Sequence, residues 1–266
     1  MIQAIDIGHA QLNVLDLGAG PPLLLVHGFP LSNTLWRHQA VALAATHRVI
    51  APDLRGFGRS SPVTGTVTMA EHADDLARLL DALEIQEPVH LCSLSMGGYV
   101  SFEFWRRYPA RLRSLILCDT KAAADTPEAA ANREKMAVDT LREGSIVAEK
   151  AMLPKLLAAD APQRQPEVVE EARQMIQGTR PETIASAQRG MAQRADMTPH
   201  LGQIALPTLL VVGELDVIST PQEMQGMAAG ISNSRLVTIP AVGHLTPLEA
   251  PVEFTTALQG FLVEKR

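Results

Sequence analysis

The sequence contains few of the residues that mark disulfide-rich, nucleic-acid-binding or membrane proteins. Only two of its 266 residues are cysteine, and we expect Cys92 and Cys118 to be buried thiols because each closes an apolar, strand-like run. The net charge of −6 argues against a nucleic-acid partner. No apolar run in the N-terminal half approaches the roughly 20 residues of a membrane span, and the first residues do not resemble a signal peptide. We therefore expect a cytoplasmic protein without a membrane partner.

Aromatic residues are also scarce, at 4% of the chain, and residues 120–200 contain none. The apolar fraction of 46% is nevertheless that of a globular protein with a large core. Residues 2–8 and 12–17 alternate apolar and polar side chains, which predicts an antiparallel hairpin with one wet face. Six short apolar runs follow and are predicted to be buried strands: Leu23–Val26, Val49–Ala51, Val89–Cys92, Leu115–Cys118, Leu209–Val212 and Leu236–Ile239.

Most of these runs are separated by helical patterns, such as the apolar face formed by Met69, Ala73, Leu76, Leu80 and Leu83. Strands that alternate with helices predict an α/β fold with a mostly parallel, doubly wound sheet. One stretch breaks the alternation, because residues 120–200 contain helical patterns but no strand-like run. We predict a core of residues 1–119 and 201–266 with a helical cap, 120–200, inserted in it. The alternative is a set of ordinary surface helices with no role in binding.

The segment from Val89 to Gly98 is the most informative for chemistry, since an apolar strand runs directly into a helix there. A serine at such a junction is exposed on a sharp turn only if the residues two before and two after it are small. Ser95 has Ser93 and Gly97 in those places, whereas Ser93 would have the large Leu91. We therefore predict Ser95 as the nucleophile.

A serine nucleophile needs a histidine base, and that base needs an acid to orient it. His244 lies in a loop after the last strand-like run, and Asp216 closely follows the run Leu209–Val212. We predict these residues as base and acid. Asp119, which directly follows Cys118, is a rival acid. Four further histidines, His9, His38, His47 and His72, are expected on the hairpin or on exposed ends of helices and strands.

An oxyanion intermediate needs fixed hydrogen-bond donors. The backbone amides of Phe29, after the first buried strand, and of Met96, at the start of the helix that follows Ser95, are predicted to form this oxyanion hole. His27 is expected to brace the loop that carries Phe29. We expect Glu71, His72, Asp74 and Asp75, which could suggest a metal site, to be a solvated helix face.

These pieces together resemble the α/β-hydrolase superfamily over almost the entire chain. The matching segments are His27-Gly28-Phe29-Pro30, Asp53 to Ser60, Ser95-Met96-Gly97-Gly98, Gly213 to Asp216, and Gly243-His244. Within the superfamily the chain resembles small cofactor-free esterases, 3-oxoadipate enol-lactonases and non-haem haloperoxidase-like enzymes. The resemblance implies an α/β-hydrolase fold, no cofactor and a small ester or lactone substrate. Ser93 departs from the family pattern, which usually has glycine there.

The sequence therefore predicts a serine hydrolase that cleaves a small carboxylic ester through an acyl-enzyme. An enol-lactonase, or a small-molecule-binding protein of the same fold with vestigial hydrolysis, is the alternative. Phe29, Trp36 and Met136 are candidates for lining the substrate pocket. Arg133 and Lys135 are candidates for binding a substrate carboxylate, although charged residues on such a helix usually face solvent.

Overall fold

In a computed structural model of the chain, which describes residues 1–264, eight strands form one sheet in the order β1-β2-β4-β3-β5-β6-β7-β8. β2 pairs antiparallel with β1 and β4, and all later pairings are parallel. This arrangement confirms the predicted fold class. The strands are β1 (Ile2–Asp6), β2 (Gln11–Leu17), β3 (Pro22–Val26), β4 (Arg48–Pro52), β5 (Val89–Leu94), β6 (Leu112–Cys118), β7 (Thr208–Gly213) and β8 (Ser234–Ile239).

The burial of the strands follows their sequence patterns. Every residue of β3, β5 and β7 is buried, as expected for continuous apolar strands covered on both faces. The hairpin alternates instead, so that Leu12 and Val14 of β2 are buried while their neighbours are not. The prediction of a buried last strand is wrong, because in β8 only Ile239 is buried. β8 lies at the edge of the sheet, where it has a neighbour on one side only.

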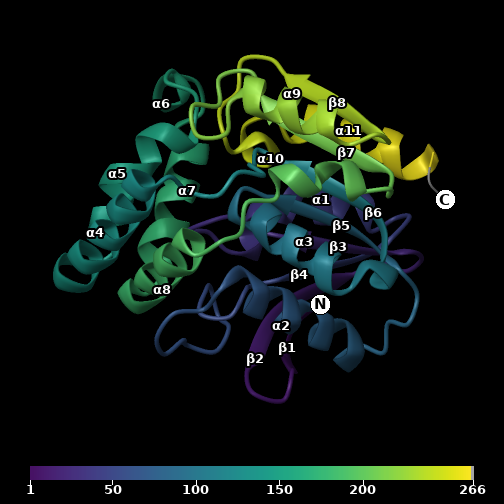
Figure 1. Cartoon of the computed structure of the whole chain (residues 1–266), viewed down its shortest axis with the longest axis horizontal. Helices are drawn as coiled ribbons and strands as arrows, with labels where there is room; N and C mark the ends of the chain where they lie inside the picture. Colours follow the sequence, from purple (N-terminus) through teal and green to yellow (C-terminus); the bar gives the residue numbers. More distant parts are fainter. Residues whose placement is uncertain (265–266) are drawn as a thin grey trace.

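Helices cover both faces of the sheet (Figure 1). α1 contacts α11 on one face, whereas α2 contacts α3 on the other. The α-helices outside residues 120–200 are α1 (Arg37–Leu43), α2 (Met69–Ala82), α3 (Met96–Arg107), α9 (Pro221–Gly230), α10 (Thr246–Glu249) and α11 (Pro251–Glu264); short 3₁₀ turns are η1 (Asn33–Trp36), η2 (Pro109–Arg111) and η3 (Thr198–Gln203).

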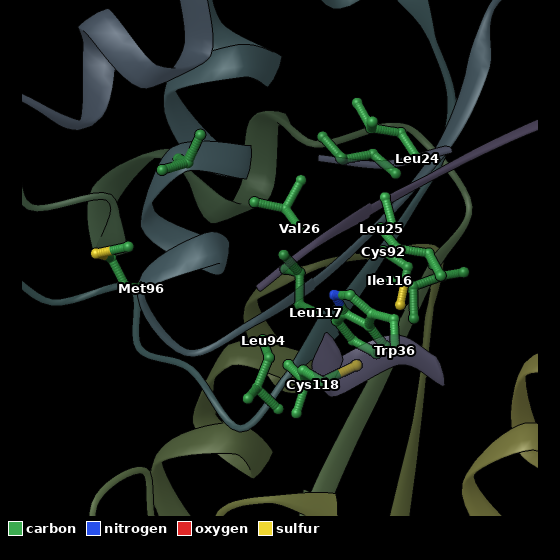
Figure 2. Packing of buried hydrophobic residues seen from close by; sticks show 14 of the residues in the cluster. Leu24, Leu25, Val26, Trp36, Cys92, Leu94, Met96, Ile116, Leu117 and Cys118 are labelled. Atoms are coloured by element: carbon green, nitrogen blue, oxygen red, sulfur yellow. The ribbon is translucent and has the colours of Figure 1, made fainter. Parts of the chain in front are cut away.

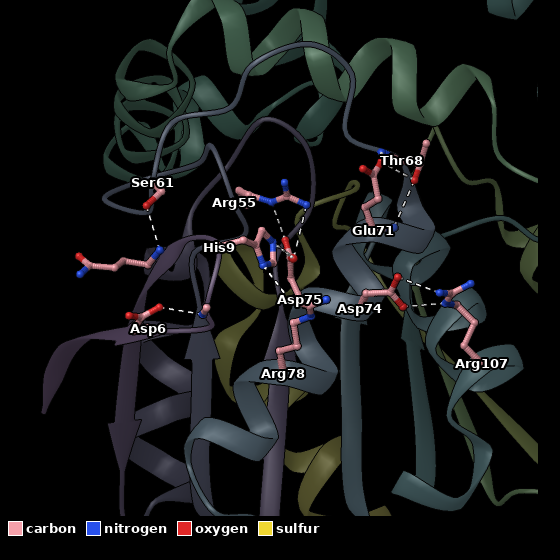
Figure 3. Close-up of polar contacts among 12 residues, drawn as sticks. Asp6, His9, Arg55, Ser61, Thr68, Glu71, Asp74, Asp75, Arg78 and Arg107 are labelled. Atoms are coloured by element: carbon pink, nitrogen blue, oxygen red, sulfur yellow. Dashed lines mark hydrogen bonds and ion pairs between the residues drawn. The ribbon is translucent and has the colours of Figure 1, made fainter.

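The start of α2 illustrates how local sequence sets these boundaries. The Thr68 hydroxyl accepts the backbone N–H of Glu71, and the Glu71 carboxylate accepts the backbone N–H of Thr68 at 2.7 Å (Figure 3). This reciprocal capping box satisfies two N–H groups that the first turn leaves without helical partners. The predicted apolar face of α2 then packs inward, with Met69, Leu76 and Leu80 buried.

Five helices lie between β6 and β7 and gather at one side of the molecule (Figure 1). They are α4 (Pro127–Glu143), α5 (Ile146–Leu156), α6 (Ala161–Arg164), α7 (Pro166–Gly178) and α8 (Pro181–Ala192). Among the described residues, no strand occurs between Cys118 and Thr208. We propose that residues 120–200 are a cap inserted in the core, and we use the word cap for this range below.

The apolar core contains two groups to which the sequence analysis gave roles. Cys92 and Cys118 are buried free thiols, as predicted. Trp36, a predicted pocket residue, is fully buried and packs its ring at 6.0 Å from that of Phe254 in α11. Figure 2 draws Trp36 within the same apolar cluster as Ile116 and Cys118. Its assignment to a substrate pocket is therefore corrected: the indole is a core side chain.

The parallel strands β3, β5, β6, β7 and β8 all end at one edge of the sheet. The loops that leave this edge carry all three residues of the predicted Ser-His-Asp triad. Within residues 1–264, no helix is long and apolar enough to cross a bilayer.

Candidate active site

Ser95 occupies a strained turn between β5 and α3. Its backbone has φ 53° and ψ −115°, a conformation that costs free energy for any residue with a side chain. The surrounding backbone holds it there, because its N–H donates to the carbonyl of Cys118 and its carbonyl accepts the Thr120 hydroxyl at 2.7 Å. The side chain is half-buried, whereas its neighbours Leu94 and Met96 are buried.

The turn requires small neighbours, as the sequence analysis argued. A Cβ atom on Gly97 would lie 2.6 Å from the carbonyl oxygen of Val26, and one on Gly28 would lie 3.1 Å from the Ser95 Cβ. Ser93 is also accommodated: its buried hydroxyl points at the carbonyl oxygen of Ile116 on β6, 3.4 Å away. The hydroxyl of Ser93, the residue that departs from the family pattern, therefore has a hydrogen-bond acceptor within the sheet.

His244 and Asp216 form a buried pair. The side chains are 1% and 0% exposed, and Nδ1 of His244 lies 2.7 Å from Oδ2 of Asp216. The other carboxylate oxygen of Asp216 accepts the backbone N–H groups of Ile218 and Ser219 at 2.7 and 3.0 Å. The acid is therefore held by three contacts, and no Lys or Arg among the described residues pairs with it.

Asp119, the rival acid, lies beside this pair, where it interacts with Asp216 and also bonds to two other groups. Its carboxyl accepts the backbone N–H of Gly213 at 2.9 Å and the hydroxyl of Thr246 at 2.6 Å. Burial and the nearby charge of Asp216 raise the pKa of Asp119 well above its ordinary value. Asp119 therefore ties the loops of Asp216 and His244 together, while Asp216 makes the hydrogen bond to the histidine.

Single side-chain atoms of Asp119, Asp216 and His244 lie within 4.8 Å of one another. Within residues 1–264 this is the one group of this kind that could hold a metal ion. However, the histidine and Asp216 atoms already bond each other. Because the N–H of Ser95 bonds Cys118, the residue before Asp119, this cluster and Ser95 share one corner of the sheet edge.

The loop after β3 carries Phe29, a predicted oxyanion donor. His27 is fully buried in this loop: its Nδ1 lies 2.9 Å from the carbonyl oxygen of Gly28, and its Nε2 accepts the N–H of Leu54 at 3.0 Å. Burial lowers the pKa of His27, which matches a neutral ring that donates at one nitrogen and accepts at the other. These contacts brace the loop.

The two cap cations considered for a substrate carboxylate are each paired with an aspartate. Arg133 forms an ion pair with Asp125 and donates to the Gln188 amide oxygen at 3.0 Å. Burial opposes ionisation of Asp125, but Arg133 and Arg194 hold its pKa below the ordinary value. Lys135 is 74% exposed and pairs with Asp139. Neither cation is an unpaired charge.

Met136 remains a candidate for lining a substrate pocket because it is only half-buried. Its sulfur accepts a hydrogen bond from the Gln188 amide at 2.8 Å. Three of the five cap methionines, Met175, Met191 and Met197, are instead buried in the apolar core cluster.

Two expectations for polar residues outside this site are wrong. His47 and His72, expected on exposed ends, are both buried. Asp75 of the expected solvated face is also buried, and its carboxylate contacts His9 and Arg55 (Figure 3). The Asp75 carboxylate is therefore held in ion pairs and does not face solvent.

Comparison with known proteins gives a consistent result. A family model described as the alpha/beta hydrolase fold matches residues 21–251. A thermophilic esterase from Thermogutta terrifontis is 44% identical, with a TM-score of 0.96 over 100% of this chain and 99% of that one. The enol-lactonase from Burkholderia xenovorans LB400 is 28% identical, with a TM-score of 0.91 over 98% of this chain and all of its own.

A third relative, 3-oxoadipate enol-lactonase 1 of Acinetobacter baylyi, is 27% identical over 91% of this chain and 88% of its own length. The strand order of the sheet and the similarity to these relatives indicate the same fold. The chain therefore belongs to the α/β-hydrolase family, and it is a hydrolase.

Proposed function

We propose that the protein hydrolyses small carboxylic esters through an acyl-enzyme formed on Ser95. The observation that carries the proposal is the position of Ser95, held in a strained turn at the same sheet edge as the buried His244–Asp216 pair. Strained backbone at a serine beside such a pair is typical of a nucleophile elbow. The esterase and enol-lactonase relatives support the same reaction class.

The first half of the reaction uses all three side chains. The bond from His244 Nδ1 to Asp216 leaves Nε2 of the ring as the free base. In the proposed step, Nε2 takes the proton of Ser95 while Oγ forms a bond to the ester carbonyl carbon. Asp216 then stabilises the imidazolium that results.

The backbone amides of Phe29 and Met96 would stabilise the oxyanion that forms. Neither N–H donates to a protein acceptor within residues 1–264, so both can donate to a ligand. Such donors are each worth about 3 kcal/mol in the transition state. Collapse of the intermediate breaks the ester C–O bond, and the imidazolium protonates the alcohol that leaves. A water molecule, deprotonated by His244, then attacks the acyl-enzyme carbonyl in the same way. Its collapse releases the carboxylic acid and returns the proton to Ser95.

A neutral ester fits the cap better than an anionic lactone. Arg133 and Lys135, the cations considered for a substrate carboxylate, are each paired with an aspartate. An anion would have to compete with those partners. The cap has no aromatic residue, and its half-buried methionines Met136 and Met152 favour aliphatic acyl chains of short or medium length.

The enol-lactonase alternative is supported by the two enol-lactonase relatives, and the reaction would use the same residues. Comparison of kcat/KM for a neutral short-chain ester and a carboxylate-bearing lactone separates the two. A preference for the lactone of 100-fold or more, about 2.7 kcal/mol, that is lost in Arg133→Ala would establish the lactonase instead.

The nucleophile is tested with a fluorophosphonate probe and a short-chain aryl ester. We expect wild type and Ser93→Gly to be labelled and to show burst kinetics, whereas Ser95→Ala should lose nearly all turnover and remain folded. Labelling that survives Ser95→Ala would place the nucleophile elsewhere. A wild-type protein that is neither labelled nor active on any ester or lactone would favour the binding-protein alternative.

A further inference from the structure

Glu249 is a buried carboxylate that the proposed mechanism does not use. It ends the short helix α10, five residues after His244, and its side chain is 0% exposed. Burial raises its pKa, although hydrogen bonds from backbone N–H groups oppose the shift. A buried carboxylate is costly unless its oxygens are satisfied, so its partners indicate what it holds in place.

The two oxygens of Glu249 bind two different parts of the molecule. Oε1 accepts the backbone N–H of Gly243, the residue directly before His244, at 2.9 Å. Oε2 accepts the backbone N–H of Ala158, between cap helices α5 and α6, also at 2.9 Å. The nearest cation, Arg164, lies 3.9 Å away and donates instead to the carbonyl of Ala241 at 2.8 Å. The carboxylate therefore bridges the histidine loop and the cap.

The same loop and cap segment also touch directly. The backbone N–H of Leu245 donates to the carbonyl of Leu156 at 3.0 Å, and the Gln165 amide donates to the carbonyl of Glu249 at 2.9 Å. A Cβ atom on Gly243 would lie 2.6 Å from Ala158 N. Both neighbours of His244 are therefore fixed through their backbone N–H groups. Gly243 donates to the Glu249 carboxylate, which also binds the cap, and Leu245 donates to the cap directly.

We propose that Glu249 is a positioning residue that fixes His244 by fastening its loop to the cap at residues 156–158. A base must be held within a fraction of an ångström of its productive geometry, so a loosened loop would weaken proton transfer without emptying the binding site. In this proposal the cap also helps to hold the loop that carries His244. The proposal rests on the proposed function, because it concerns the base of that reaction.

Glu249→Gln tests the bridge because its amide offers one acceptor oxygen to two N–H donors. We expect kcat to fall 10- to 100-fold while KM stays within threefold. The proton on His244 Nδ1, seen far downfield in NMR spectra of such histidine–carboxylate pairs, should shift or broaden. Glu71→Gln is the matched control, since Glu71 also accepts a backbone N–H but lies at the start of α2; it should keep wild-type kinetics and the wild-type resonance.

Gly243→Ala is the second variant, which removes no hydrogen-bonding group but forces the cap segment away from the loop. We expect the same loss in kcat at unchanged KM, whereas Gly178→Ala, where nothing lies within 4 Å of the added methyl, should have no effect. The proposal is overturned if the folded fraction of either bridge variant retains kcat within threefold and an unchanged His244 resonance. Failure of the proposed function looks different, since wild type itself would then escape the fluorophosphonate probe.

Discussion

Two histidine–aspartate pairs occur within residues 1–264, and we propose a catalytic role for only one of them. His244 and Asp216 meet at 2.7 Å with both side chains buried. His9, in the turn between β1 and β2, meets Asp75 of α2 at 2.9 Å, but the histidine is 38% exposed (Figure 3). The two pairs have similar distances but differ in the burial of the histidine and in the other partners of the carboxylate.

The carboxylates differ most. Asp75 is shared with the Arg55 guanidinium at 2.8 Å, and Arg78 also lies 3.2 Å from the His9 ring. Asp216 forms no ion pair with a Lys or Arg of residues 1–264, and its second oxygen is held by two backbone N–H groups. A carboxylate already neutralised by arginine has less charge to offer an imidazolium. The comparison teaches that a histidine–aspartate contact alone does not identify a catalytic dyad, because the other partners of the carboxylate decide how much charge it can offer to the histidine.

The largest expected difference comes from removing the acid of each pair. Asp216→Asn should lower kcat by about four orders of magnitude, because the histidine is left in the wrong tautomer. Asp75→Asn should leave kcat within a few-fold and lower the melting temperature instead. Steady-state kinetics and thermal unfolding of both variants check this. A large loss of kcat in folded Asp75→Asn would remove the distinction between the pairs.

Arg55 should matter for stability only. Arg55→Gln leaves a buried carboxylate with His9 as its remaining side-chain partner, and we expect the free energy of unfolding to fall by about 2 kcal/mol. Urea unfolding measures this, with Arg142→Gln as control because Arg142 and its partner Glu143 are both exposed. Equal stability of both variants would mean that the Arg55 pair contributes no more than a surface contact.

His72 sharpens the comparison because it is a buried histidine that forms no ion pair with a carboxylate in the described part of the chain. Burial, followed by the charge of Arg55, lowers its pKa to about 3. In the unfolded chain the pKa of this histidine has its ordinary value of roughly 6.5. Between that pH and about pH 3, the unfolded chain therefore binds one proton more than the folded chain. The free energy of unfolding should therefore fall as the pH is lowered, by up to about 1.4 kcal/mol per pH unit from this group.

His72→Gln should flatten this pH dependence between about pH 6 and 4.5. The control, His200→Gln, changes an exposed histidine and should leave the slope as in wild type. Urea unfolding at several pH values measures both. Equal slopes in all three proteins would contradict a neutral, buried His72.

The smallest effect is expected from Asp119→Asn. An asparagine oxygen can still accept the Gly213 N–H, and the Thr246 hydroxyl can accept from its amide. We expect kcat to fall less than about 10-fold, or 1.4 kcal/mol. If kcat instead falls as far as in Asp216→Asn, the acid of the triad is shared between two carboxyls.

Sequence reasoning placed the strands well because their apolar runs are continuous and end at turn residues. The same patterns put Ser95, Asp216 and His244 at one edge of the sheet, where the structure has them. These features depend on local periodicity and on the order of parallel strands, both of which are readable along the chain.

The errors concern side chains whose burial depends on distant segments. Asp75 was expected on a wet face, but its partners are 66 and 20 residues away at His9 and Arg55. Trp36 gave no sign that it would pack against Phe254. The role of Glu249 cannot be read from the sequence because a glutamate near a chain turn usually faces solvent. Its proximity to His244 in sequence was the only available signal.

The cap leaves the core from β6 and re-enters it at β7, two strands that lie side by side. Its two ends therefore meet without help from the cap itself, so exchanging the insertion for one of another length would change the chain entropy of closure only slightly. A foreign insertion would still have to present an N–H group where Ala158 now meets Glu249. Recombination between family members can thus introduce new pockets, provided that the insertion re-establishes the contacts that Leu156, Ala158 and Gln165 now make with the histidine loop and Glu249.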